Sequence, residues 1–136
     1  MLESAENYLE TVLVLGQSGK RVRSIDIANE LCVSKPSVSI AMKGLREKGL
    51  IETSSDGIIY LTAEGQQIAE SMFERHMLIS DWLIYLGVDE KTAVTDACRI
   101  EHALSEESFL AIKKHIENWK RDEIPQRKIN YQGGSI

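Results

Sequence analysis

The chain has 136 residues, of which 43% are hydrophobic, and a net charge of −5. This length allows one compact domain or two small ones that share an interface, and no apolar run approaches the ~20 residues that cross a bilayer, so we expect no membrane partner. The acidic segment Met1–Glu6 differs from a signal peptide, which predicts a cytoplasmic protein whose two cysteines, Cys32 and Cys98, stay reduced.

The N-terminal part of the chain has the pattern of three short helices. The spacing of apolar residues predicts them over residues 4–15, 25–31 and 35–48. Ser4, Ser24 and Ser34 are the expected N-caps, because each places a hydroxyl just before a helix. Pro36 falls in the first turn of the third helix, where proline is tolerated, and Gly49 is a suitable stop. The second and third helices, joined by a tight turn, predict a helix-turn-helix.

A β-hairpin is expected directly after these helices. Two short runs rich in β-branched residues, 50–53 and 58–61, lie on either side of the turn pair Asp56-Gly57. The order helix, helix-turn-helix, hairpin is typical of a winged helix.

The C-terminal part predicts further helices over residues 63–86, 89–104 and 105–119. The expected fold class is therefore mostly α, with an N-terminal winged helix-turn-helix domain followed by an all-helical domain. The expected boundaries are 1–62 for the first domain, 63–119 for the second, and 120–136 for a flexible tail.

Charge is unevenly distributed along the chain. The segment from Lys20 to Lys48 carries seven basic and three acidic residues, a local charge of +4, so the remaining residues sum to −9. Such a segment is either a DNA-facing surface or an ordinary solvated one. The hairpin that follows the helix-turn-helix favours DNA.

The DNA-binding candidates lie mainly on the second helix of the helix-turn-helix, which enters the major groove in such proteins. Small hydroxyl residues permit close approach to phosphates, Ile40 suits a thymine methyl group, and the basic side chains suit phosphates. No Arg or Asn begins this helix, so sequence readout is expected to depend partly on DNA shape. The candidate set is Arg23, Ser34, Lys35, Pro36, Ser37, Ser39, Ile40, Lys43 and Arg46.

A metal site is indicated by Cys98, Glu101 and His102. Their positions i, i+3 and i+4 place a thiol, a carboxylate and an imidazole on one face of a helix. Each residue alone is more easily read as a core or surface side chain, but the shared face indicates a divalent transition metal.

Three further residues are candidate ligands. His76 lies on the preceding long helix, which an antiparallel arrangement would bring beside Cys98. Glu10, with Asn7 one turn earlier on the same helix face, offers oxygen ligands from the N-terminal helix. His115 has no such companions and is expected at the surface.

The chain resembles the metal-dependent repressors that include the diphtheria toxin repressor and the manganese transport regulator, over about residues 4 to 118. The segments that carry the resemblance are Asn7–Glu10, Ser34–Ser39, Leu61–Gly65, Arg75-His76 and Asp96–Ser105. It implies a homodimer whose second domain binds metal and dimerises, and which binds palindromic operator DNA when loaded with Fe(II) or Mn(II). It also implies repression of metal-uptake genes. We expect no enzymatic activity, because the sequence offers no general base beside the metal ligands and no Gly-rich or nucleophile motif.

Residue by residue, the resemblance implies that Glu101 and His102 are ligands in both branches of the family. His76 and Glu10 match ligand positions of the manganese branch. Asn7 departs from both branches, which have methionine or aspartate at this position, so its part in the site is left open.

The position of Cys98 is a cysteine in the iron branch of the family and a glutamate in the manganese branch. A thiolate favours Fe(II), Co(II), Ni(II) or Zn(II) over Mn(II). We therefore expect Fe(II) to be the physiological metal, with Mn(II) as the alternative, and expect Zn(II), Co(II) or Ni(II) to bind in vitro.

Two other classes of function remain open from the sequence. One is a metal-dependent hydrolase that uses the same ligands around a water molecule. The other is a winged-helix regulator that responds to an organic ligand or to oxidation of Cys98.

Overall fold

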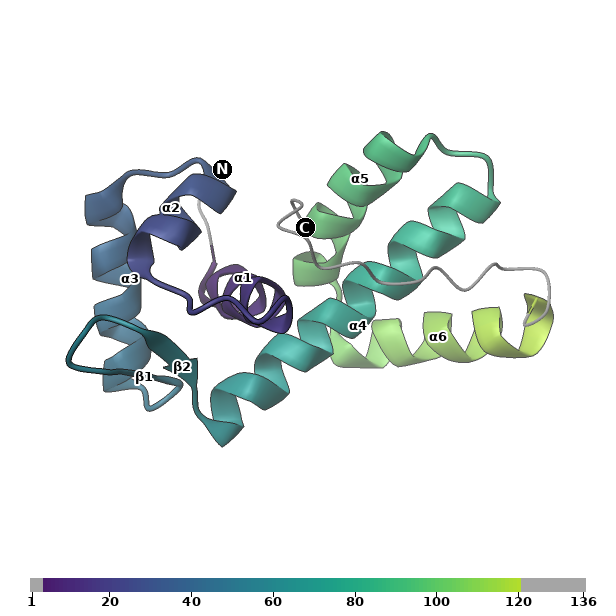
Figure 1. Cartoon of the computed structure of the whole chain (residues 1–136). Helices are drawn as coiled ribbons and strands as arrows, with labels where there is room; N and C mark the ends of the chain where they lie inside the picture. Colours follow the sequence, from purple (N-terminus) through teal and green to yellow (C-terminus); the bar gives the residue numbers. More distant parts are fainter. Residues whose placement is uncertain (1–3, 121–136) are drawn as a thin grey trace. The chain divides into compact units, whose positions relative to one another are not determined.

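The structure is a computed structural model that describes residues 4–120 (Figure 1). Its helices and strands are α1 (Ala5–Gln17), α2 (Ser24–Leu31), α3 (Lys35–Glu47), β1 (Ile51–Thr53), β2 (Ile59–Leu61), α4 (Ala63–Tyr85), α5 (Glu90–Ala103) and α6 (Glu106–Lys120). They form two compact units that divide within α4, so that Ser71 ends the N-terminal unit and Met72 begins the C-terminal unit. The tail was expected over 120–136, but Lys120 is the last residue of α6, and residues 121–136 lie outside the described part of the chain.

The N-terminal unit is a winged helix, which confirms the predicted fold class. Helix α1 contacts α2, α3 and β2, while α3 also contacts α2 and β1 (Figure 1). Its core contains Leu9 from α1, Ile27 from α2, and Val38 and Met42 from α3, all at most 1% exposed. Val38 and Met42 lie one helical turn apart and face the same core as Leu9 and Ile27, and the burial of these apolar side chains stabilises the packing of the three helices.

The helix caps follow the predicted pattern at Ser4 and Ser34, whose hydroxyls accept the backbone N–H groups three residues on. The predicted cap at Ser24 is wrong, because Ser24 is the first helical residue and Arg23 occupies the N-cap position. The Asp26 carboxylate accepts the backbone N–H of Arg23 at 2.9 Å. At the start of α2, the Asp26 carboxylate therefore binds the backbone N–H of the N-cap residue itself.

The wing is the antiparallel hairpin β1–β2, with Ile51 paired to Leu61 and Thr53 paired to Ile59. Gly57 has φ +86° in the connecting turn, a conformation that favours glycine. The backbone N–H of Ile59 also donates to the carbonyl of Val22 at 2.8 Å. The wing is therefore hydrogen-bonded to the segment that precedes α2.

Cys32 closes α2 in the left-handed conformation, with φ 55° and ψ 43°. An L-residue with a Cβ is strained there, and its exposed thiol makes one weak contact, 3.8 Å from the carbonyl of Asn29. We expect Cys32→Gly to stabilise the N-terminal unit by about 0.5–1 kcal/mol. Thermal unfolding of the two proteins measures this difference, and a lower melting temperature for the variant would contradict it.

The C-terminal unit consists of the rest of α4 with α5 and α6. The turn after α4 contains Gly87 at φ +103°, and the side chain of Asp89 caps α5 by accepting the N–H of Thr92 at 3.3 Å. Ser105 caps α6 in the same way at 3.1 Å from the N–H of Ser108. Among residues 4–120, no helix has the length and apolar character needed to cross a membrane.

Candidate metal centre and nucleic-acid interface

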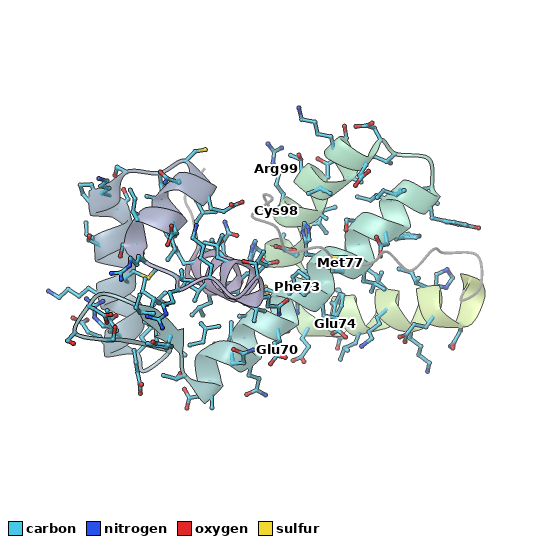
Figure 2. The ribbon with its side chains drawn as sticks, in the orientation of Figure 1. Glu70, Phe73, Glu74, Met77, Cys98 and Arg99 are labelled. Carbon is cyan, nitrogen blue, oxygen red and sulfur yellow. The ribbon has the colours of Figure 1, made fainter. Side chains whose placement is uncertain are left out.

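Helix α5 brings Cys98, Glu101 and His102 together, as their spacing predicted. One ligand atom from each, the Sγ, a carboxylate oxygen and an imidazole nitrogen, lies within 4.8 Å of the other two. Figure 2 shows Cys98 on α5, with Phe73 and Met77 on the neighbouring α4. The three side chains range from half-buried to fully buried, so they form a partly enclosed cluster rather than a solvated surface.

Glu101 is at the centre of this cluster. Its carboxyl group is fully buried, and its Oε1 lies 3.2 Å from Nε2 of His102. Its Oε2 lies 3.2 Å from Nδ1 of His76, which α4 contributes and which is 6% exposed. The expected approach of His76 to the α5 residues is therefore present, and one buried carboxylate lies between two imidazoles from different helices.

Arg75, beside His76 on α4, holds the end of α5 in place. It is 6% exposed, and its guanidinium donates to the backbone carbonyls of Glu101 at 3.0 Å and Leu104 at 2.6 Å. The same group lies 5.0 Å from the ring centroid of Phe109 on α6. This role was not predicted from the sequence. The signal that could have indicated it is the position of Arg75 directly beside the candidate ligand His76.

The donor set fits a divalent transition metal. Thiolate, imidazole and carboxylate groups are ligands of Fe(II), Zn(II) and neighbouring ions. A buried carboxylate is costly unless positive charge or hydrogen bonds compensate it, and a bound cation provides such compensation. The arrangement of Cys98, Glu101, His102 and His76 is therefore suited to holding a metal.

The other two candidate ligands lie on a different part of the chain. Asn7 and Glu10 are on α1, in the N-terminal unit, three residues apart and thus on one helix face. Both are buried. His115, expected at the surface, is exposed on α6.

The helix-turn-helix presents the predicted DNA-binding candidates on one exposed face of α3. Along this helix Val38, Met42 and Leu45 are buried. The exposed candidates there are Ser34, Lys35, Pro36, Ser37, Ser39, Ile40, Lys43 and Arg46. Ile40 is 74% exposed, so its apolar side chain is accessible to a partner. This exposed face carries the basic side chains Lys35, Lys43 and Arg46.

Two of the predicted DNA-binding arginines contact the wing. The Arg46 guanidinium donates to the hydroxyl of Thr53 on β1 at 3.2 Å. The Arg23 guanidinium donates to the backbone carbonyl of Asp56 in the turn of the wing. Both arginines are exposed, so these contacts place them at the border between the helix-turn-helix and the wing.

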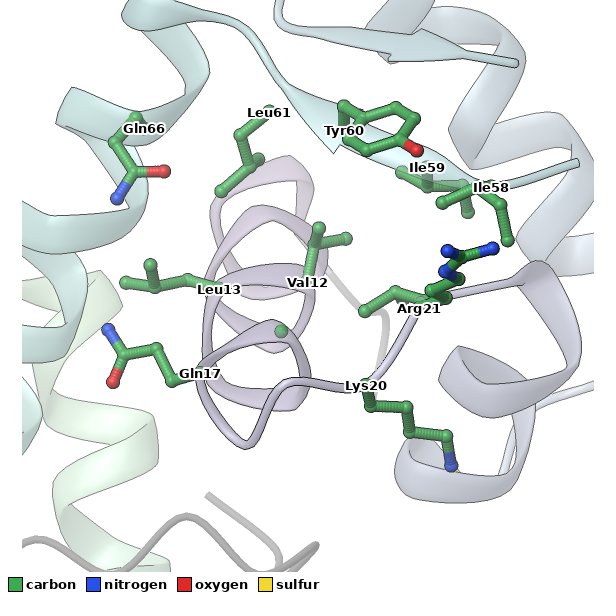
Figure 3. A pocket seen from close by; sticks show the side chains of 12 residues that line it. Val12, Leu13, Gln17, Lys20, Arg21, Ile58, Ile59, Tyr60, Leu61 and Gln66 are labelled. Atoms are coloured by element: carbon green, nitrogen blue, oxygen red, sulfur yellow. The ribbon is translucent and has the colours of Figure 1, made fainter.

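A hollow of about 450 Å³ in the N-terminal unit lies between α1 and β2 (Figure 3). Val12 and Leu13 of α1 and Ile59 of β2 contribute apolar surface to it. Lys20, one of its basic side chains, is held by the Asp26 carboxylate at 3.1 Å. This hollow lacks the cluster of buried donor atoms found on α5. Of these two places within residues 4–120, the α5 cluster is therefore the better candidate for binding a regulatory ligand.

A winged helix joined to a helical unit that carries a sulfur, nitrogen and oxygen donor cluster is the combination found in metal-dependent transcription regulators. Residues 1–58 match the N-terminal DNA-binding domain of the iron-dependent repressors. Residues 62–128 match the metal-binding and dimerisation domain of the same family. The chain belongs to the iron-dependent repressor family, and is therefore a metal-dependent transcriptional regulator and not an enzyme. The two domains together indicate a homodimer that binds DNA.

Individual relatives agree with this assignment. The chain is 36% identical to the transcriptional regulator MntR of Escherichia coli over 111 residues, 82% of this chain and 72% of the relative. It is 32% identical to an uncharacterised HTH-type transcriptional regulator of Methanocaldococcus jannaschii over 122 residues, 88% of this chain and 98% of the relative.

Solved structures with the same fold include the manganese regulator SloR, at 25% identity and a TM-score of 0.77, covering 97% of this chain and 65% of that one. A manganese-dependent transcriptional repressor in complex with manganese is 27% identical with a TM-score of 0.79, covering 92% of this chain and 55% of that one. The chain thus spans less than two thirds of these two solved proteins.

Proposed function

We propose that this protein is an Fe(II)-responsive repressor that binds a palindromic operator as a homodimer and controls metal-uptake genes. The observation that carries the proposal is the position of Cys98, whose Sγ belongs to the same cluster as Glu101 and His102. A thiolate ligand favours Fe(II) over the harder Mn(II), which prefers carboxylate and carbonyl oxygens. Cys98, Glu101, His102 and His76 are the proposed ligands from the C-terminal unit.

Metal and DNA binding are coupled, in this proposal, through α1. Glu10, and Asn7 one turn before it, complete the ligand shell when α1 docks against the C-terminal unit. Docking fixes the two recognition helices of the dimer about 34 Å apart, the separation of successive major grooves. Metal therefore favours the DNA-binding arrangement, and DNA reciprocally tightens metal binding, with a coupling of ~1–3 kcal/mol.

Regulation by Mn(II) is the second candidate. It is favoured by the relatives, since the solved structures include a manganese regulator and a manganese-dependent repressor. Glu10 and His76 supply the oxygen and nitrogen ligands that such a site needs. The two candidates differ in what they require of Cys98.

Substitution of Cys98 distinguishes the two metals. We expect the wild-type protein, titrated anaerobically, to bind DNA at a lower free Fe(II) than Mn(II) concentration. Cys98→Glu should shift the ratio of these two concentrations toward Mn(II) by about tenfold or more, because a carboxylate replaces the thiolate. The measurement is the fluorescence anisotropy of a duplex selected from a random-sequence pool with the metal-loaded protein. A wild-type preference for Mn(II), unchanged in the variant, would establish the second candidate.

Thiol labelling provides an independent check that Cys98 is a ligand. Metal should slow the reaction of its thiol with an alkylating reagent, since a coordinated thiolate is shielded. Cys32 is exposed in the N-terminal unit and serves as the internal control, with a labelling rate that metal leaves unchanged. Equal labelling of Cys98 with and without Fe(II) would count against the proposed ligand set.

A further inference from the structure

We propose that Arg23 acts in DNA binding as a positioning residue that fixes the tip of the wing, rather than as a phosphate contact. The inference builds on the DNA-binding role of the winged helix. It starts from the contact between the Arg23 guanidinium and the backbone carbonyl of Asp56. A Cβ built at Gly57 would lie 3.5 Å from Nη1 of Arg23, so the guanidinium also lies against the glycine of the turn.

The backbone from which the Arg23 side chain extends is held by hydrogen bonds. The backbone N–H of Arg23 donates to the Asp26 carboxylate at 2.9 Å at the start of α2, and Lys20 holds the same carboxylate at 3.1 Å. One residue earlier, the carbonyl of Val22 accepts the N–H of Ile59 at the beginning of β2. Arg23 therefore extends from an anchored backbone to the far end of the same hairpin.

The wing has no cation of its own. Residues 51–61 contain two ionisable acids, Glu52 and Asp56, and no lysine or arginine. The hydroxyl of Ser54, the backbone at Asp56 and the nearby charge of Arg23 hold the pKa of the Asp56 carboxyl below its usual range, so this tip is anionic. The tip itself therefore has no charged group that attracts phosphates, and the Arg23 guanidinium at its carbonyl holds the tip in place.

If Arg23 acts by positioning the wing, its contribution to DNA affinity depends on an intact wing tip. Arg23→Gln should weaken binding to the selected duplex roughly tenfold, as expected for loss of a charge-assisted hydrogen bond. Because the wing brings no cation to the phosphates, the slope of log affinity against log salt should stay unchanged. Lys35→Gln is the comparator, for which loss of a phosphate contact in both protomers lowers that slope by about two.

A double-variant cycle makes the test independent of salt. Replacing Ser55-Asp56-Gly57 by Asn-Gly, a two-residue hairpin turn, removes the carbonyl that Arg23 binds and keeps the strand pairing. In this shortened wing Arg23→Gln should have no further effect on DNA affinity. Three results would overturn the inference. They are a lowered salt slope for Arg23→Gln, wild-type DNA affinity of that single variant, and an undiminished effect of Arg23→Gln in the shortened wing.

Amide hydrogen exchange tests the contact without DNA. The N–H groups of Gly57 and Ile58 donate to Ser54, at 3.0 Å each, and close the turn. Their exchange should become faster in Arg23→Gln while the amides of α3 keep their wild-type rates. Unchanged exchange at the turn would overturn the positioning role, and this test does not require DNA. Failure of the metal-loaded protein to select any duplex would count against the proposed function and not against the positioning role.

Discussion

Glu101→Gln is expected to lower the metal affinity of the protein by roughly 100-fold or more, and to remove the metal-dependent rise in its melting temperature. Both oxygens of the Glu101 carboxylate face imidazole nitrogens at 3.2 Å, so the neutral amide removes a charged ligand at the centre of the cluster. The amide has nearly the same shape and no buried charge. The metal-free protein should therefore be at least as stable as the wild type.

This combination separates a ligand from a merely structural residue. If Glu101 served only to hold α4 and α5 together through His76, the variant would unfold at a lower temperature without metal and keep its metal affinity. Glu70→Gln is the matched control, since it removes an exposed carboxylate of α4. Isothermal titration and thermal unfolding of the wild type and both variants distinguish the cases. Unchanged metal affinity of Glu101→Gln would contradict the proposed site.

Gly65→Ala is expected to destabilise the N-terminal unit by about 3 kcal/mol or more. The first turn of α4 lies directly against the end of α3, where Thr62 donates through its N–H to Leu50 and through its hydroxyl to Gly49. A Cβ on Gly65 would lie 2.0 Å from the carbonyl oxygen of Leu50, well inside contact distance. The backbone would have to separate to accept a methyl group, with loss of these hydrogen bonds.

The control for this substitution is Gly44→Ala in α3. A Cβ there meets no atom within 4 Å, so alanine should stabilise the helix by about 0.5–1 kcal/mol. The two variants make the same chemical change with opposite expected signs. Equal melting temperatures for Gly65→Ala and the wild type, measured by circular dichroism, would contradict the close approach at Leu50.

The helices and the wing follow from local features of the sequence. Their apolar spacing predicted each helix, and Ser4 and Ser34 are caps as expected, because capping depends on residues within one turn. The cap at Ser24 was predicted wrongly for a similar reason. Arg23 takes the N-cap position, with its backbone N–H bound to the nearby Asp26 carboxylate, so α2 begins one residue earlier than expected.

The candidate site is predictable to the extent that it lies on one helix. The spacing of Cys98, Glu101 and His102 within α5 required no knowledge of the fold. The role of Arg75 was not predictable, because its partners are backbone carbonyls some 30 residues away. Every residue has a backbone carbonyl, so the amino-acid sequence does not indicate which one an arginine will bind. The contact of Arg23 with the carbonyl of the wing turn was missed on the same grounds, and its charge suggested a phosphate contact instead.

The central claim is that metal bound at the Cys98 cluster controls DNA binding. The most direct test compares the wild-type protein with the double variant Cys98→Ala/His102→Ala, binding the selected duplex anaerobically with and without Fe(II). We expect the wild type to bind DNA tightly only with metal, and the double variant to bind at the metal-free level under both conditions. Equal DNA binding by the wild type with and without metal, or an intact metal response in the double variant, would contradict the claim.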